Sequence, residues 1–237
     1  MVSNVTKRFL RGTMPALDLG PIWLTLKLAT VTTALLITIA VPLSAWLAHA
    51  PRRLRLPLHA LVCMPLVLPP SVLGFYLLLA FSPNHGFGRL LKETVGISLA
   101  FSFPGLVIGS VLFSLPFMVN PVLAGFDALP ASLSEASYVL GKSSLTTFLR
   151  VSLPNLRPAL LSGTVLAFAH TLGEFGVVLM IGGKIPGVTR VASIAVFDEV
   201  ESLHFGAAHA YALVLFAVSF VILLALFFLN RKSPRPF

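Results

Sequence analysis

The chain has 237 residues, of which 57% are hydrophobic and 11% charged, and its mean hydropathy is +0.94. Because about a quarter of the residues in soluble domains are charged, this composition indicates a membrane protein and excludes an ordinary water-soluble fold. The formal net charge is +9, but the basic residues flank apolar stretches and do not line one face with interleaved aromatic residues. A nucleic-acid-binding surface is therefore not predicted.

Five apolar stretches are long enough to cross a bilayer, since a spanning helix needs about 20 mostly apolar residues. They occupy residues 22–48, 57–81, 97–119, 158–181 and 207–229. We expect an all-α integral membrane protein with about five transmembrane helices. A polar segment, residues 1–21, precedes the membrane domain of residues 22–229, and a basic tail, residues 230–237, follows it. The first segment has no short apolar core with a cleavage site, so it is not a signal peptide.

Prolines interrupt the second stretch at Pro69 and Pro70, just before Ser71. Two consecutive prolines remove two amide donors and force an extended residue before them. Irregular backbone at membrane depth is tolerated only where protein or a cavity lines it. These three residues are candidates for a gate in a translocation path, with a purely structural kink as the alternative. Cys63, the single cysteine, forms neither a disulfide framework nor a metal cluster and is interpreted as a small packing residue.

A polar segment at residues 130–154 separates the third and fourth stretches. Ser132 and Glu135 have the spacing of a capping box, which predicts a helix start just after Pro130. Gly141 is the expected end of that helix, because glycine adopts the left-handed C-terminal conformation without a steric penalty.

A second short helix is expected to begin at Ser143 or Ser144, either of which could cap it, and to run up to Pro154. The segment as a whole is thus predicted to form a helix–turn–helix outside the bilayer. An exposed element of this kind is suited to being held by a partner.

The fourth stretch contains Thr171, Gly173, Glu174 and Gly176. An ionisable side chain within a span is costly and faces the protein interior, and the two glycines permit close backbone approach or a helix distortion. These four residues are candidates for a pathway or a subunit interface. The alternative is that Glu174 is neutral or hydrogen-bonded and locks the bundle, which an anionic cargo would favour because a bare carboxylate would repel it.

Residues 182–200 follow the fourth stretch and open on glycines and a proline that indicate a turn. The subsequent alternation of apolar and polar residues predicts a short re-entrant or interfacial segment. The densest group of ionisable residues also lies here: Asp198, Glu199, Glu201 and His204. A membrane enzyme would need such a cluster, but we interpret it as a solvated loop face.

Basic residues in short loops predict the orientation, because cytoplasmic loops carry an excess of lysine and arginine. Placing three basic regions in the cytoplasm puts the N-terminus outside and the C-terminus inside. These regions contain Arg52, Arg53, Arg55, Lys142, Arg150, Arg157, Arg231, Lys232 and Arg235. The N-terminal residues Lys7, Arg8 and Arg11 run against this assignment.

The polar segment resembles the cytoplasmic coupling loop of importer-type ABC permeases, whose pattern is Glu-Ala-Ala, three residues, Gly, nine residues, Ile-x-Leu-Pro. Five positions match, and Val151 and Ser137 are small departures from it. In that family the loop docks into a cleft on a separate ATPase subunit and transmits its closure to the membrane helices. The resemblance therefore assigns ATPase docking to Glu135, Ala136, Ser137, Gly141, Leu153 and Pro154.

Three further motifs are similar to those of the molybdate subfamily of these permeases. They are Pro-Pro-Ser-Val-Leu-Gly-Phe-Tyr at residues 69–76, Leu-Gly-Glu-Phe-Gly at 172–176 and Ile-Pro-Gly-x-Thr-Arg at 185–190. Sulfate permeases share a similar Gly-Glu-Phe/Tyr-Gly element. The resemblance implies molybdate as the cargo, with tungstate left open and a sulfate or thiosulfate permease as the alternative.

The same resemblance implies a plasma (inner) membrane assembly. Two copies of the chain would pair with two cytoplasmic ATPase subunits and an extracytoplasmic molybdate-binding protein, which would meet the loops at 82–96 and 182–206. The chain is expected to be no enzyme, with no catalytic residue, metal or cofactor of its own. A phosphate-binding loop ending at Gly141-Lys142-Ser143 would need glycine where Ala136 stands. A secondary anion transporter is the remaining alternative, but no internal repeat supports it.

Overall fold

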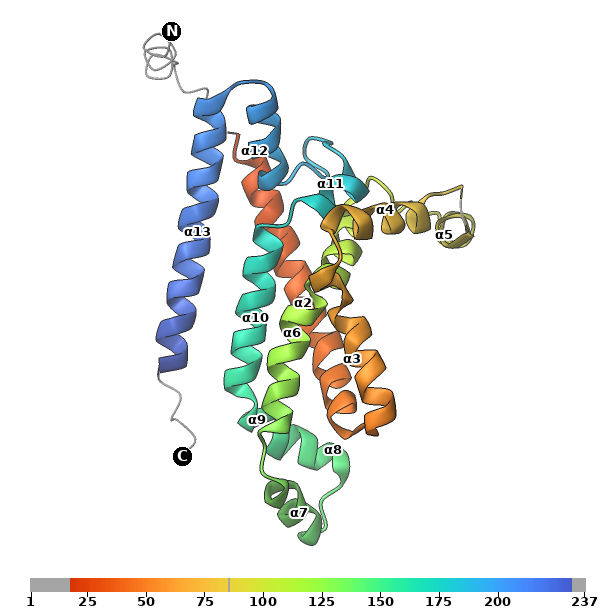
Figure 1. Cartoon of the computed structure of the whole chain (residues 1–237), viewed down its shortest axis with the longest axis vertical. Helices are drawn as coiled ribbons and strands as arrows, with labels where there is room; N and C mark the ends of the chain where they lie inside the picture. The colour runs from red at the N-terminus through yellow and green to blue at the C-terminus, as the bar shows by residue number, and fades with distance from the viewer. Residues whose placement is uncertain (1–17, 85, 232–237) are drawn as a thin grey trace. The chain divides into compact units, whose positions relative to one another are not determined.

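The structure is a computed structural model that describes residues 18–84 and 86–231. The predicted basic clusters at residues 7–11 and 232–235 lie outside the described residues. Within the described residues the chain is entirely helical, with no strand, which confirms the predicted all-α class (Figure 1). The helices are α2 (Gly20–His49), α3 (Arg52–Val67), α4 (Pro70–Phe81), α5 (Gly86–Val95), α6 (Phe103–Asp127), α7 (Ala131–Val139), α8 (Ser144–Thr147), the π-helix η1 (Phe148–Ser152), α9 (Leu153–Asn155), α10 (Arg157–Leu172), α11 (Gly176–Gly182), α12 (Ala192–Glu201) and α13 (Phe205–Arg231).

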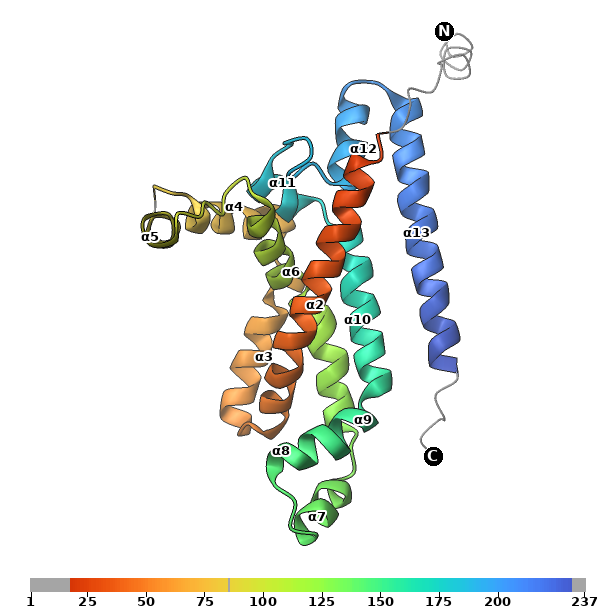
Figure 2. The same ribbon diagram turned by 180° about the vertical axis from the view of Figure 1, so that it is seen from behind.

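The helices belong to two compact units. The first unit contains Pro69–Ser110, Thr171–Val221 and the chain up to Thr32, and the second contains Thr33–Leu68, Val111–His170 and the chain from Ile222. Helices α2, α6, α10 and α13, which are labelled in Figure 2, each contribute residues to both units.

Three helices, α2, α6 and α13, are long and apolar enough to cross a membrane, and the number rises to five if the pairs α3–α4 and α10–α11 each count as one span. This matches the five predicted stretches. The predicted interruption in the second stretch is present, since Leu68 and Pro69 are extended and Pro70 is the first residue of α4. Proline is tolerated there because the first turn of a helix needs no partner for its amide groups.

Two expectations about the third stretch and the loop before it were wrong. Helix α6 spans Phe103–Asp127, whereas residues 97–119 were predicted. Its start is set by Ser102, whose hydroxyl accepts a hydrogen bond of 3.3 Å from the Gly105 amide. Residues 82–96, expected as a loop, contain α5, whose apolar residues recur at helical spacing and whose Arg89 pairs with Glu93 at 2.7 Å.

The core of the second unit lies where α2, α6 and α10 pack together. Gly125 and Gly163 permit this approach, because a Cβ atom on Gly163 would lie 2.8 Å from the sulfur of Met118. The buried residues of this core are Leu36, Ala40, Leu47, Met118, Val119, Val122, Leu123, Phe126, Leu156 and Ala167. This packing fixes the ends of α6 and α10, between which the polar segment is held.

Candidate functional site

The polar segment of the second unit forms the predicted helix–turn–helix. Helix α7 starts at Ala131, directly after Pro130, as expected. The capping-box interpretation was wrong, because Pro130 occupies the N-cap position, Ser132 already lies inside the helix, and no side chain caps it. A proline before the helix sets an extended approach without any hydroxyl, so the Ser-x-x-Glu spacing was coincidental here.

Gly141 ends α7 as predicted. Its φ angle is +70°, and two backbone hydrogen bonds close the end of the helix, from Gly141 to Tyr138 at 2.9 Å and from Lys142 to Ser137 at 3.1 Å. This is the Schellman arrangement, in which a left-handed residue lets the last carbonyl groups find partners. The end of α7 is thus a defined turn.

The second part of the segment begins at Ser143, whose hydroxyl accepts a hydrogen bond of 3.3 Å from the amide of Thr146. Helical structure then continues through α8, η1 and α9 to Asn155, close to the predicted end at Pro154. The π-helical turn at Phe148–Ser152 was not predicted. A hydrogen bond of 2.8 Å between the buried hydroxyls of Ser137 and Thr147 joins α7 to α8. Ser137 is one of the two departures from the coupling-loop pattern. It makes a hydrogen bond between α7 and α8 that alanine could not make.

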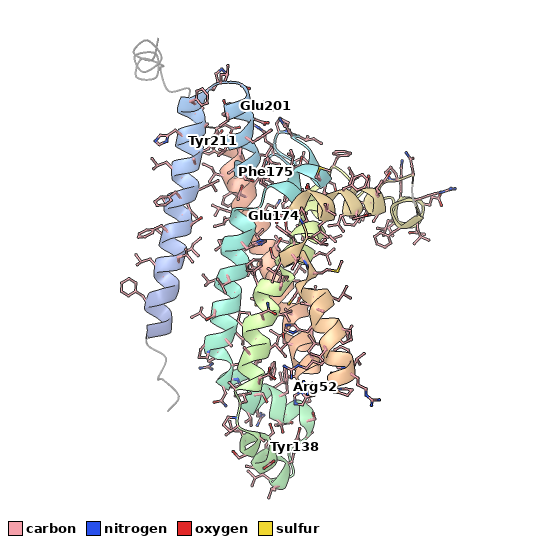
Figure 3. All side chains as sticks on the ribbon, viewed as in Figure 1. Arg52, Tyr138, Glu174, Phe175, Glu201 and Tyr211 are labelled. Carbon is pink, nitrogen blue, oxygen red and sulfur yellow. The ribbon has the colours of Figure 1, made fainter. Side chains whose placement is uncertain are left out.

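This element exposes several large apolar side chains. Val139 is 88% exposed and Leu140 74% exposed, and they lie beside the turn at Gly141. Tyr138 lies on α7 (Figure 3). We call this surface the docking face and define it by Tyr138, Val139, Leu140, Leu145 and Leu149, all of them exposed. The sequence analysis missed these residues, although an apolar run inside a polar segment could have revealed them.

The remaining docking-loop residues lie on the same element. Glu135, Ala136, Gly141 and Pro154 are exposed, and Leu153 is half-buried. On its inner side the element is anchored by Phe148, whose ring stacks on that of Phe126 in α6 with a centroid distance of 6.3 Å. The segment therefore exposes apolar side chains near its turn and is fastened to α6 through Phe148.

The candidate gate residues lie in the first unit, at the junction of α4 and α11. Pro70 and Gly176 are brought together, and a Cβ atom on Gly176 would lie only 2.8 Å from the Cβ of Pro70. Gly74 makes a second close approach, since a Cβ atom added there would lie 2.7 Å from the Cβ of Met180. Glycine at these positions is required by the contact, since a larger residue would separate the two helices. Pro69 and Ser71 lie beside this junction and are exposed.

Glu174 lies in the break between α10 and α11 and is only 4% exposed (Figure 3). Neither oxygen of its carboxyl group has hydrogen-bond geometry with a described residue, and the hydroxyl of nearby Ser110 also has none. Its backbone carbonyl accepts a hydrogen bond of 2.6 Å from Ser193. Gly173 is exposed and Thr171 is buried. A pathway role for these residues stays a prediction.

The ionisable group near residue 200 lies on α12 and the turn after it, where a loop was expected, and it forms an ion-pair network at a partly exposed surface. Lys184 contacts Asp198 at 2.8 Å and Glu201 at 2.7 Å. Arg190 contacts Asp198 at 2.9 Å and also pairs with Glu199. The hydrogen bonds to Asp198 and Glu201 raise the pKa of the Lys184 ammonium group, which therefore remains charged. Within residues 18–84 and 86–231 no cluster suited to a metal ion is present.

Helix α12 carries these acidic residues and is fixed by neighbouring helices of the first unit. The hydroxyl of Thr25 in α2 accepts a hydrogen bond of 2.8 Å from the Ala192 amide at the start of α12. Thr189 closes the preceding turn by donating to the carbonyl of Gly182 at 2.6 Å. The predicted interfacial segment is therefore a turn and a helix that are held by specific contacts.

Comparison with known proteins places these features in context. Residues 40–233 match the family model described as binding-protein-dependent transport system inner membrane component. The chain is 44% identical to the molybdenum transport system permease protein ModB of Azotobacter vinelandii, over 90% of this chain and 95% of that protein. It is 36% identical to the sulfate transport system permease protein CysT of Salmonella typhimurium, over 81% of this chain and 69% of that protein.

The fold is also that of a solved transporter. A bacterial ABC transporter involved in the import of the acidic polysaccharide alginate contains a chain that superimposes with a TM-score of 0.77. The match covers 97% of this chain and 84% of that chain, at 16% sequence identity, and so concerns the fold alone.

Proposed function

The chain belongs to the family of binding-protein-dependent transport system inner membrane components, and from this premise we propose that it is the permease subunit of an ATP-driven importer of molybdate. The family places it in the inner membrane as a component of a transport system. Molybdate is favoured because the molybdenum permease of Azotobacter vinelandii shares 44% of its residues with this chain over nearly the whole of both proteins.

The docking face is the observation that carries the ATP-driven part of the proposal. Exposed leucine, valine and tyrosine side chains outside the spans mark a protein interaction site, because soluble surfaces rarely leave such residues together. The chain has no phosphate-binding loop, so ATP hydrolysis would reside on a separate subunit that holds this face. Two ATPase subunits would serve two copies of the chain.

The docking face is well placed to transmit movement. Helix α7 follows α6 after only residues 128–130, and α9 leads into α10 across Leu156, which is buried in the core of the second unit. Short connections and the Phe126–Phe148 ring contact mean that a displacement of the face moves the ends of α6 and α10 with it. Closure of the ATPase subunits on ATP would thereby switch the paired permeases from an inward-open to an outward-open state.

The remaining partners follow from the same assignment. An extracytoplasmic binding protein would deliver molybdate to the side of the turn at residues 183–191, and the cytoplasm would lie on the side of α7 and α8. The N-terminus would then lie outside and the C-terminus inside. The permease itself needs no tight cargo site, because the binding protein can set the specificity.

A sulfate permease is the second candidate, because the CysT protein of Salmonella typhimurium is 36% identical to this chain. The discriminating experiment is uptake of labelled molybdate by proteoliposomes that contain the chain, its ATPase and its binding protein. We expect ATP-dependent uptake that tungstate blocks and that a large excess of sulfate leaves unchanged. Competition by sulfate would assign the chain to sulfate transport, and uptake that needs no ATP would reject the importer.

A further inference from the structure

A line of polar contacts joins α3 to α6 within the second unit. Arg55, His59 and Cys63 are spaced four residues apart and so lie along one face of α3. They contact Asn120 and Asp127 of α6, which are seven residues apart and also share a face. We call these five residues the polar seam. None of them belongs to the docking face or to the α4–α11 junction.

Two of the three contacts of the polar seam end on the same amide, that of Asn120. Nε2 of His59 lies 2.9 Å from Oδ1 of Asn120, and the thiol of Cys63 donates to the same oxygen at 3.4 Å. Arg55 pairs with Asp127. Both bonds end on Oδ1, so they orient the amide without using either of the two N–H donors on its Nδ2 atom. In the part of the chain that the structure describes, no hydrogen bond involves that Nδ2 group.

The polar seam is partly open at the surface of the chain. Helix α3 has no fully buried residue, and His59, Cys63 and Asn120 are each only part-buried. Arg55 and Asp127 lie at the ends of their helices, where the proposed orientation would put them near the cytoplasm, and their side chains are 29% and 45% exposed. Elsewhere α3 exposes apolar residues such as Leu61, which is 62% exposed. Polar groups of a spanning helix do not face hydrocarbon, because their hydrogen bonds would go unmade. An open polar seam on such a helix must therefore face water or another protein.

We propose that the polar seam lines the route of the cargo and that the Asn120 amide is a contact for the oxyanion; this rests on the proposed function. A neutral N–H donor suits an anion that must pass, since binding has to be favourable enough for entry and weak enough for release. The pairing of Arg55 with Asp127 likewise prevents a bare guanidinium from holding the anion tightly. The competing account is that the seam only fastens α3 to α6, as polar residues do between membrane helices.

Cys63 makes the proposal testable, because it is the only cysteine of the chain and lies in the polar seam. The complete transporter in nanodiscs is treated with the anionic reagent methanethiosulfonate ethylsulfonate, and modification of this chain is followed by mass spectrometry. We expect Cys63 to react without nucleotide and to react at least tenfold more slowly after trapping with ATP and vanadate. A Cys63 that reacts only in the denatured chain, or equally fast in both states, would overturn the proposal.

A matched control uses the opposite face of the same helix. In a Cys63→Ser background, Leu61→Cys places a thiol two residues away among exposed apolar residues. We expect this cysteine to stay unreactive toward the anionic reagent in both states. Equal reactivity at the two positions would show that the reagent reports access to α3 in general, and the argument for the seam would fail.

The role of the amide is tested by substitution in the assembled transporter. Asn120→Asp places a negative charge at the contact, and we expect molybdate uptake to fall at least tenfold while the complex with the ATPase remains intact. Uptake that stays at the wild-type rate would overturn the assignment of Asn120. If the wild-type transporter carries sulfate and Cys63 reacts as expected, sulfate would replace molybdate as the cargo, and the polar seam would still line its route. If molybdate is taken up but Cys63 does not react, the proposed function would stand and only the role of the polar seam in the cargo route would be rejected.

Discussion

Glu174 is the residue for which burial changes the interpretation most. From the sequence it was either a pathway residue or a carboxyl that locks the bundle. The structure shows a 4% exposed side chain whose carboxyl group lies near the Ser110 hydroxyl, without hydrogen-bond geometry to it. An ionised carboxylate without a partner is costly in such surroundings. The burial therefore favours a packing role over contact with an anion.

Substitution of Glu174 separates these roles. Glu174→Gln keeps the volume and removes the ionisable group, so we expect at least half of the wild-type uptake and an unchanged thermal midpoint. Glu174→Ala leaves a cavity, and we expect it to lower the free energy of unfolding by about 2 kcal/mol or more. Both are measured on the purified transporter by thermal denaturation and uptake. A Gln variant that assembles normally but does not transport would show that the carboxylate itself is needed.

At the scale of elements, the glycine in the turn between α7 and α8 can be compared with a second glycine of the same backbone conformation. Gly141 and Gly187 have φ angles of +70° and +72°, and a Cβ atom at either position would meet nothing within 4 Å. Substitution by alanine therefore imposes the same backbone strain at both, with no steric clash. Only Gly141 adjoins the docking face.

We predict that Gly141→Ala and Gly187→Ala each lower the free energy of unfolding by about 1 kcal/mol. Only Gly141→Ala should weaken binding of the ATPase subunit, by about fivefold, because strain at this turn displaces Leu140. Binding is measured by titration of the ATPase onto the permease in nanodiscs, and uptake is expressed per ATP hydrolysed. Equal weakening by both variants would contradict a special role of the α7–α8 turn.

The elements also show which features the sequence could predict. Glycine and proline act locally, so the end of α7 at Gly141 and the break before Pro70 were correctly expected. The start of α12, by contrast, is held by Thr25 of α2, which is 167 residues away in sequence. Contacts of this second kind appear only once the helices are packed.

The candidate site likewise has features that the sequence could predict and features that only the packed structure shows. The docking loop was identified because its spacing resembles a known family, and its exposed apolar residues were then supplied by the structure. The contact of Pro70 with Gly176 joins two interruptions that the sequence revealed separately. Nothing in the sequence indicated that they meet, because 105 intervening residues, 71–175, carry no signal of their pairing.

For the molecule as a whole, the orientation of the chain in the membrane determines which partner can reach the docking face and which can reach the opposite side. Basic residues in the connection from α2 to α3 and in the α7–α8 segment favour the cytoplasm for both. If the bent pairs α3–α4 and α10–α11 each count as one span, the chain has five spans, and an odd number would place its two ends on opposite sides of the membrane. In the proposed orientation the turn at residues 183–191 would lie outside the cell and the turn at Lys142 in the cytoplasm.

The chain's single cysteine allows this orientation to be tested in whole cells. In a Cys63→Ser background, Val188→Cys lies in an exposed turn and should react with a membrane-impermeant maleimide added to intact cells. Lys142→Cys, also exposed, should react only after the membrane is permeabilised. The reverse pattern would place α7 and α8 outside, where no ATP-hydrolysing partner could reach the docking face. Because docking by an ATPase requires the cytoplasm, this result would overturn the ATP-driven mechanism as well as the orientation.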